Sequence, residues 1–249
     1  MNPIALVAHR GYCKKYPENT LLALATAIQA GARFIETDIQ LSRDLVPVLY
    51  HDRDMRRISN LPGAIHDYPF NELVMLPAYE PQRFGDNFID QKITPLADLV
   101  RLLLANPQVH AFVEIKRCAI RRHGIETLYS KVTELLQPVA DRTTLISFSL
   151  PFVEYAAKAG WHSFGPVIKR WSDTRSTKLK TLRPAYIFCD EEHLPATGTI
   201  SIPGSRLVIY EIDDPQSAID LHERGADMIE TFAIAELQHS LTERFNVTV

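Results

Sequence analysis

Short apolar runs alternate with amphipathic stretches along almost the whole chain. The first run, residues 4–9, is typical of a buried strand, and residues 18–31 then carry apolar side chains at helical spacing. Pro17 stands beside the start of this predicted helix and Gly31 ends it. The same spacing predicts helices at 96–104, 125–136, 152–159 and 215–224, with mixed helical character from residue 233 onward. This alternation favours parallel strands that are joined by crossover helices.

One connection breaks the alternation. Only residues 42–44 separate the predicted strands 34–41 and 45–51. Because a parallel crossover needs about a dozen residues or more, these two strands must form an antiparallel hairpin. When the returning arm is set aside, eight strands remain, at 4–9, 34–41, 111–116, 144–148, 162–168, 185–189, 207–212 and 227–231.

Eight parallel strands in a chain of 249 residues predict an α/β fold, a (β/α)8 TIM barrel with an antiparallel hairpin arm. The alternative, a doubly wound open sheet, should carry a Gly-rich turn after its first strand, and none is present. We expect residues 1–249 to form a single domain with an insertion at about 53–94. This insertion is rich in proline and aromatic residues, and we expect it to fold over the barrel mouth. The alternative is an excursion packed on the side of the barrel.

Composition and charge exclude several classes of protein. With 46% hydrophobic and 23% charged residues, the chain is neither disordered nor a fibrous repeat. A net charge of −3 leaves no overall basic field for binding nucleic acid or an anionic membrane. No apolar stretch approaches the roughly 18 residues of a membrane span, and the first apolar run is too short for a signal peptide. We therefore expect no stable membrane insertion, while the oligomeric state is not predicted.

The chain has three cysteines, without metal-ligand spacing. A disulfide framework and a zinc ribbon are both disfavoured by this number and spacing. A reducing compartment is the simpler interpretation, and we expect a cytoplasmic protein.

Three carboxylates fall on predicted strands. Glu36 and Asp38 lie two residues apart and so point to the same face, and Glu114 ends another strand. Buried carboxylates need a metal or basic partners, because burying their charge alone is costly. At C-terminal strand ends, the three form a hard oxygen site suited to one divalent cation, Mg²⁺ or Ca²⁺. The alternative is a set of salt bridges to the basic residues Arg10, Lys116 and Arg33.

Two histidines are expected near these carboxylates. His9 ends the first strand, and His51 ends the returning arm of the hairpin. The path from Asp38 to the turn near Asp44 is about as long as the path back to His51, at ~3.3 Å per residue on both arms. His51 therefore returns to the level of Asp38. Two histidines near one metal allow a general base and a general acid on opposite sides of a reacting centre. The alternative for each is a structural or metal-ligating histidine.

Arg10 and Lys116 add fixed positive charge beside the same strand ends. Arginine suits bidentate contact with a phosphate, and lysine acts as a point charge. A metal, two imidazoles and two cations fit an anionic substrate whose transition state gains charge, so phosphoester hydrolysis is the natural candidate.

The order and spacing of six short motifs resemble the glycerophosphodiester phosphodiesterase family. These motifs are HRG (9–11), PENT (17–20), ETD (36–38), PV (47–48), HD (51–52) and EIK (114–116). The resemblance implies a (β/α)8 barrel that hydrolyses small glycerophosphodiesters to sn-glycerol 3-phosphate and an alcohol. It also implies the following roles: metal ligation by Glu36, Asp38 and Glu114, acid/base catalysis by His9 and His51, and phosphate contact by Arg10 and Lys116. The residues do not decide which histidine is the base; the resemblance implies His9 as the proton acceptor and His51 as the donor.

The sequence departs from the family pattern at two places. A tryptophan-threonine pair is replaced by Tyr210 and Glu211, and an aspartate near the last strand is replaced by Phe232. We expect Glu211 to be a surface acid, and the alternative is that it adds a carboxylate to the site. These departures bear on selectivity for the alcohol or the glycerol. Two further functions stay open: lysophospholipase D-like hydrolysis of single-chain lipids, and a non-catalytic barrel that binds glycerol phosphate.

Overall fold

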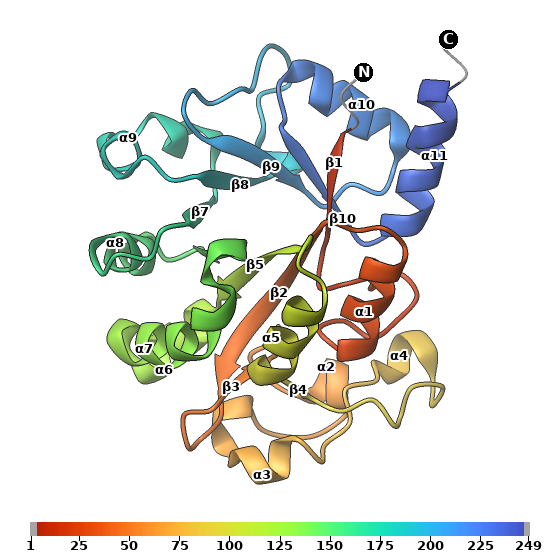
Figure 1. Cartoon of the computed structure of the whole chain (residues 1–249), viewed down its shortest axis with the longest axis vertical. Coiled ribbons are helices and arrows are strands. Elements are labelled where there is room, and N and C mark those ends of the chain that lie inside the picture. The colour runs from red at the N-terminus through yellow and green to blue at the C-terminus, as the bar shows by residue number, and fades with distance from the viewer. Residues whose placement is uncertain (1–3, 247–249) are drawn as a thin grey trace.

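The computed structural model describes residues 4–246, and within them eight parallel strands close into a barrel (Figure 1). Closure occurs at β1 (Ala5–Ala8), which pairs with both β10 (Met228–Thr231) and β2 (Phe34–Leu41). The other barrel strands are β5 (His110–Ile115), β6 (Thr143–Ser147), β7 (Phe164–Ile168), β8 (Tyr186–Asp190) and β9 (Arg206–Tyr210). The predicted (β/α)8 barrel is confirmed, and the open sheet is excluded.

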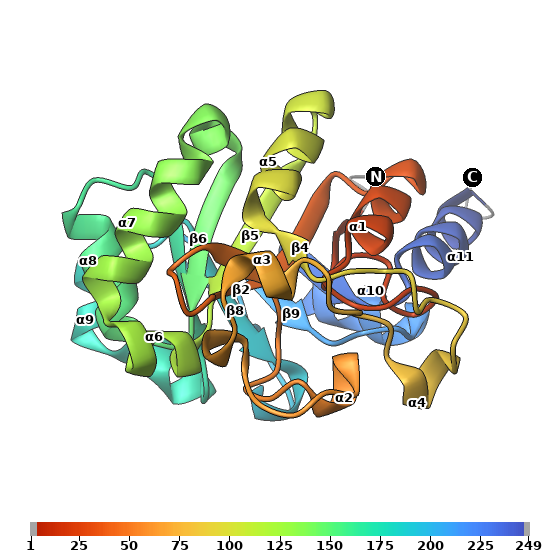
Figure 2. The same ribbon diagram turned by 90° about the horizontal axis from the view of Figure 1, so that it is seen from below.

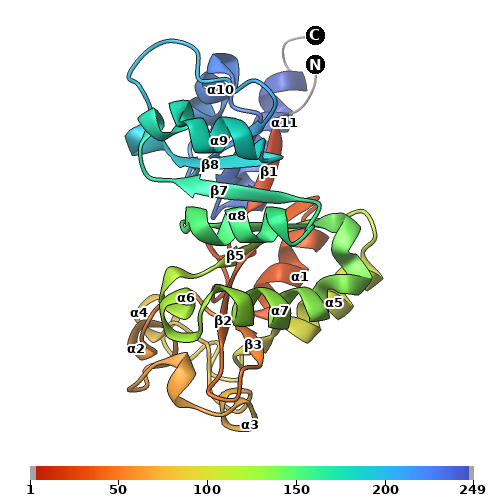
Figure 3. The same ribbon diagram turned by 90° about the vertical axis from the view of Figure 1, so that its left-hand side faces the viewer.

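Helices surround the barrel, and α5, α7 and α8 pack beside one another along one side of it (Figure 3). The main helices are α1 (Leu21–Gln29), α5 (Leu96–Ala105), α6 (Arg117–His123), α7 (Ile125–Leu136), α8 (Leu150–Lys158), α9 (Thr177–Leu182), α10 (Pro215–Arg224) and α11 (Ile234–Asn246). Short 3-10 helices are η2 (Gln137–Arg142), η3 (Trp171–Arg175) and η4 (Glu191–His193). Within residues 4–246, no helix is long and apolar enough to cross a membrane.

The first helix is shorter than the predicted span of 18–31. It begins at Leu21, because the Thr20 side chain accepts a hydrogen bond from the Ala23 N–H and so caps the helix. The residues before this cap form a loop, which leaves Glu18 and Asn19 free to reach the strand ends.

The hairpin arm is confirmed. β2 pairs antiparallel with β3 (Pro47–Leu49), and β3 pairs in turn with β4 (Thr94–Pro95). The Tyr50 N–H donates to the carbonyl of Asp38 at 2.9 Å, so the chain leaves the hairpin beside Asp38 with His51 next. This is the position beside Asp38 that the equal lengths of the two arms predict for His51.

The insertion at 53–94 lies beside β2 and β3 and contains the short helices α2 (Arg56–Ser59), α3 (Phe70–Leu73) and α4 (Pro81–Phe84), together with η1 (Ile65–Asp67) (Figures 1 and 2). It has its own small hydrophobic cluster, which includes Met55 and Leu73. It contacts the loop before α1, at the C-terminal end of the barrel, through Arg57 and Glu80, which bind Glu18, and through Arg83, which donates to the carbonyl of Cys13. The insertion therefore supports the rim of the barrel mouth.

Strand alternation places the site at the C-terminal end of the barrel. Inside the barrel, buried apolar side chains form a filled layer that includes Val7, Phe112, Phe188, Val208 and Met228. The residues two positions further along these strands share the same face. They are His9, Glu114, Asp190, Tyr210 and Glu230, so a polar layer lies directly above an apolar one.

Candidate active site

A cavity of about 500 Å³ lies over this polar layer. Most of the predicted site residues line it, namely His9, Arg10, Glu36, His51, Glu114 and Lys116. The remaining one, Asp38, is fully buried and contacts two of them, with its Oδ2 3.2 Å from Arg10 Nε and its Oδ1 3.0 Å from Lys116 Nζ. The structure therefore brings all the predicted site residues together.

The basic residues are held among the carboxylates. Lys116 Nζ lies 3.0 Å from Asp38 Oδ1 and 3.1 Å from Glu114 Oε1, and the Arg10 backbone N–H donates to Glu36 at 3.1 Å. Lys116 and Arg10, with His51, outweigh the effect of burial and hold the pKa of Asp38 well below its usual value. Of the salt bridges that were the alternative to a metal site, those to Arg10 and Lys116 are thus present, and among the described residues none involves Arg33.

The residues also fit a divalent cation. One oxygen each from Glu36, Asp38 and Glu114 lies within 4.8 Å of the others, and all three side chains are buried. Burial and the charge of Asp38 raise the pKa of Glu36 well above its usual value, and burial raises that of Glu114. An all-carboxylate set of this kind suits Mg²⁺ or Ca²⁺, and the charge of such an ion would let all three ionise together.

His9 lies between two carboxylates. Its Nε2 is 3.6 Å from Glu36 Oε2, its Nδ1 is 3.3 Å from Glu211 Oε1, and its ring stacks on Phe232 with centroids 4.8 Å apart. Burial and the neighbouring Arg10 lower the pKa of His9 well below its usual value. A neutral imidazole in this position is able to accept a proton.

His51 is held from one side by the adjacent residue. Its Nδ1 lies 2.7 Å from Asp52 Oδ1, and Arg57 donates to both oxygens of Asp52. Burial opposes ionisation of Asp52, but its contacts with His51 and Arg57 outweigh this and lower its pKa. With Nδ1 engaged, Nε2 is the ring atom left for proton exchange at the cavity.

The loop before α1 supplies two residues that the sequence analysis placed in a helix. Glu18 is buried and bridges Arg10 and Arg57, with contacts of 3.2 Å and 2.8 Å. The Asn19 side chain donates to Asp38 Oδ2 at 2.9 Å and accepts from the Asp38 N–H at 3.0 Å. These contacts explain the PENT motif, which was noted in the sequence without a role for either side chain.

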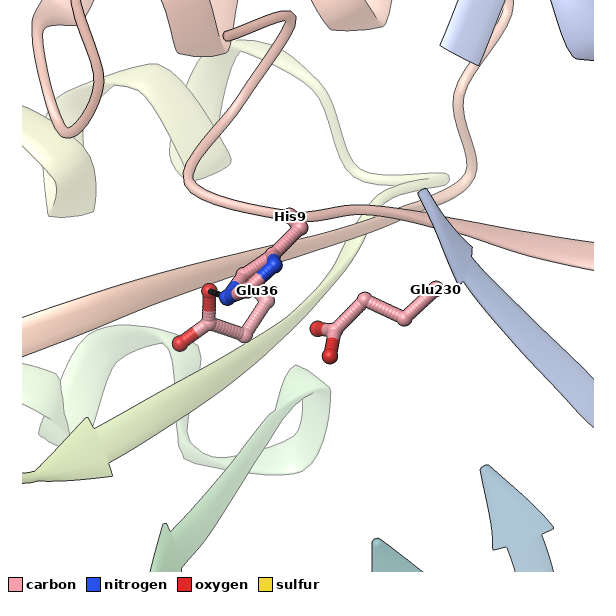
Figure 4. Close-up of side chains that lie close together, drawn as sticks. All are labelled: His9, Glu36 and Glu230. Carbon is pink, nitrogen blue, oxygen red and sulfur yellow. Dashed lines mark ion pairs between the residues drawn. The ribbon is translucent and has the colours of Figure 1, made fainter. Parts of the chain in front are cut away.

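A further buried acid was missed. Glu230, on β10, lines the cavity beside His9 and Glu36 (Figure 4). Burial and the charge of Glu211 raise its pKa well above the usual value. Alternation was the available signal, because Glu230 stands two residues after Met228, an inward-facing position.

The chain matches the family model described as "Glycerophosphoryl diester phosphodiesterase family" over residues 9–159. It belongs to this family. A glycerophosphodiester phosphodiesterase of Bacillus altitudinis is 32% identical over 143 residues, which cover 57% of each chain. Glycerophosphodiester phosphodiesterase 1 of Homo sapiens is 34% identical over 133 residues, covering 53% of this chain and 40% of that protein. The match spans about half the length of these curated relatives.

Solved structures of phosphodiesterases share the fold. A phosphodiesterase of Oleispira antarctica, solved in complex with the product sn-glycerol-3-phosphate, aligns with a TM-score of 0.83 and 24% identity over 97% of both chains. A glycerophosphodiester phosphodiesterase of Thermotoga maritima aligns with a TM-score of 0.73 and 24% identity over 97% of this chain and 99% of its own. These alignments cover the barrel beyond the region that the family model matches.

The departures from the glycerophosphodiester phosphodiesterase pattern all lie at the site. Tyr210 and Glu211 line the cavity, and Phe232 stacks on His9. Glu211 is exposed, as expected of a surface acid. Its position at the end of β9 also places its carboxylate 3.3 Å from His9 Nδ1, so it adds an acid to the lining of the cavity as well.

Proposed function

We propose that this chain is a divalent-metal-dependent phosphodiesterase that converts glycerophosphodiesters to sn-glycerol 3-phosphate and an alcohol. The observation that supports it most is the placement of two histidines and two cations around one cluster of three buried carboxylates. Family membership supports the same reaction class.

The roles follow from the contacts. Glu36, Asp38 and Glu114 would hold the cation, which when bound polarises the phosphoryl oxygens. Arg10 and Lys116 add positive charge where the phosphoryl group gains negative charge.

The two histidines divide the proton transfers. His9, which is buried and neutral, accepts the proton of the nucleophile. His51, oriented by Asp52, donates a proton to the leaving alkoxide. The nucleophile is either water or the glycerol hydroxyl of the substrate, and the second would give a cyclic phosphate that ³¹P NMR detects.

The test is release of glycerol 3-phosphate from glycerophosphocholine with Mg²⁺ or Ca²⁺. We expect EDTA, His9→Ala and His51→Ala each to abolish it. Full activity in His9→Ala would contradict its role as proton acceptor.

The two other functions have less support. A lysophospholipase D-like enzyme would use the aromatic insertion as an acyl groove, but no residue of 53–94 lines the cavity. A non-catalytic barrel was suggested by the departures at 210–232, yet these leave both histidines and all three carboxylates in place. We expect a cytoplasmic, small-molecule enzyme, and the free state of all three cysteines supports a reducing compartment.

A further inference from the structure

A second group of acids lines the cavity on the side away from the hairpin. We define the acidic wall as Asp190, Glu211 and Glu230, which come from the adjacent strands β8, β9 and β10 or the residue that follows them. Strand register supports their proximity, since Asp190 pairs with Tyr210, the neighbour of Glu211, and the Ile212 N–H donates to the Glu230 carbonyl at 2.9 Å.

Basic side chains are not bound to the acidic wall, although Lys169 and His193 line the same cavity. In the part of the chain that the structure describes, no lysine or arginine forms a salt bridge with the wall, and the neutral His9 lies 3.3 Å from Glu211. Arg10 and Lys116 are committed elsewhere, to Glu18, Asp38 and Glu114. A single divalent ion at the three metal-site carboxylates would leave the three acids of the wall outside its coordination.

Glu230 carries the strongest indication of a ligand. Its side chain is 3% exposed and lines the cavity, and within residues 4–246 its Oε1 accepts no hydrogen bond. Figure 4 shows the carboxylate directed toward the space beside His9 and Glu36. A buried carboxylate without a partner is costly, so a bound cation would be stabilised here.

The shape and lining of this side suit an organic cation. Phe148, Phe188 and Tyr210 line the same cavity, and aromatic faces attract alkylammonium groups. A small inorganic ion is a poorer match, because among the described residues the three acids do not fall into one group of possible metal ligands: Glu230 groups with His9 and Glu36, Asp190 groups with Glu192 and His193, and Glu211 is in neither. The charge of the wall is spread from the buried Glu230 to the exposed Glu211.

We propose that the acidic wall binds a cationic alcohol group, so that the preferred substrates are glycerophosphodiesters of choline- or ethanolamine-type alcohols. This inference rests on the proposed hydrolysis. The phosphoryl group then lies toward β1, β2 and β5, and the ammonium group lies toward β8, β9 and β10. Diesters with neutral alcohols, such as glycerol, lose the second contact.

The first test compares kcat/KM for glycerophosphocholine with that for glycerophosphoglycerol. We expect a preference of about tenfold or more for the choline diester, and a loss of most of it in Asp190→Asn and in Glu211→Gln. The ratio cancels any loss of catalysis that both substrates share. Asparagine preserves the backbone cap, in which Asp190 Oδ1 accepts from the Glu192 N–H at 3.0 Å. Glu191→Gln is the matched control, because Glu191 is exposed and does not line the cavity.

A second test uses inhibitors instead of substrates. We expect choline to inhibit at least tenfold better than its neutral isostere 3,3-dimethylbutan-1-ol, and the difference to narrow in the double variant Asp190→Asn, Glu211→Gln. Equal inhibition by the two compounds would overturn the proposal. So would equal kcat/KM for the two diesters, or an unchanged ratio in both single variants.

The number of metal ions bound per chain distinguishes this proposal from the alternative, in which the acidic wall binds a second inorganic cation. Binding of two Mn²⁺ ions per chain, with one lost in Glu230→Gln, would overturn the proposal in favour of a second metal at the wall. Binding of one Mn²⁺ in both proteins supports it. Hydrolysis of both diesters at equal rates would leave the proposed function intact, whereas hydrolysis of neither diester with any metal would count against the proposed function itself.

Discussion

The Nδ1 of His51 lies 2.7 Å from the Oδ1 of Asp52. The contact is fixed from behind, since Arg57 donates to Asp52 Oδ2 from Nε at 2.7 Å and to Oδ1 from Nη2 at 2.8 Å. A histidine oriented in this way presents one defined nitrogen to the cavity. The insertion thus takes part in the site without lining it.

Asp52→Asn should lower kcat for glycerophosphocholine by roughly 10–100-fold, because an amide can hold the ring in the wrong tautomer. KM should change much less, since Asp52 is not placed against the substrate. Asp54→Asn is the control, because Asp54 is exposed and its role, accepting from the Arg56 N–H, is one that asparagine also performs. Unchanged kcat in Asp52→Asn would show that the contact does not orient His51.

Addition of Mg²⁺ or Ca²⁺ should raise the Tm, and the gain should follow ligand concentration as expected for binding to the folded state alone. The physical reason is relief of repulsion among Glu36, Asp38 and Glu114, whose oxygens lie within 4.8 Å of one another. Differential scanning calorimetry with and without EDTA measures it. Glu36→Gln should remove most of the gain, and an equal gain in that variant would speak against this cluster as the binding site.

Arg57→Met should reduce the free energy of unfolding at pH 7 by about 2 kcal/mol, since Arg57 makes charged hydrogen bonds to Glu18 and Asp52 and is partly exposed. Urea unfolding measures the loss. Arg56→Met, at an exposed neighbouring position, should cost far less.

The loss of stability in Arg57→Met should also depend on pH. The pKa values of Glu18 and Asp52 are both lowered in the folded chain, although burial opposes this. Their stabilisation is therefore complete above the unfolded pKa values of about 4 and is lost as the pH falls through the folded values. The difference between wild type and Arg57→Met should shrink below about pH 4. A difference that grows on acidification would contradict this assignment.

Gly11→Ala should destabilise the protein by about 2–4 kcal/mol and lower activity. Gly11 has a φ of +84°, and a Cβ there would lie 2.6 Å from the backbone carbon of Ala23 in α1. The turn that carries His9 and Arg10 would have to move. Gly198→Ala is the control, because Gly198 has a similar φ of +88° but open space around it, so that only backbone strain of about 1–2 kcal/mol is added. Equal losses in unfolding free energy would show that the contact with α1 is unimportant.

The sequence was sufficient for the barrel and for the level of His51, because both depend on counting. A connection of 42–44 is too short for a crossover, and the two arms of a hairpin advance equally per residue. The hydrogen bond from the Tyr50 N–H to the Asp38 carbonyl confirms that the returning arm reaches the level of Asp38 just before His51. Local geometry of this kind needs no knowledge of distant contacts.

The residues that were missed depend on distant contacts or on a small change of boundary. Glu18 looked helical because the apolar spacing continues behind it, whereas the Thr20 cap and the pairing with Arg57 across the insertion decide its position. Glu211 is exposed as expected, but its contact with His9 joins distant parts of the chain and does not follow from local spacing. Glu230 could have been predicted, because it stands two residues after Met228 on the same strand and so points to the same, inward face.

The filled apolar layer beneath the site limits how molecules can reach and leave it. Side chains such as Val7, Phe112 and Met228 are fully buried there and leave no passage through the barrel. In the proposed reaction, substrate, water, cation and both products would share the opening at the C-terminal end. Each turnover would then end only when the products have left through that opening, and a bound product would compete directly with the next substrate.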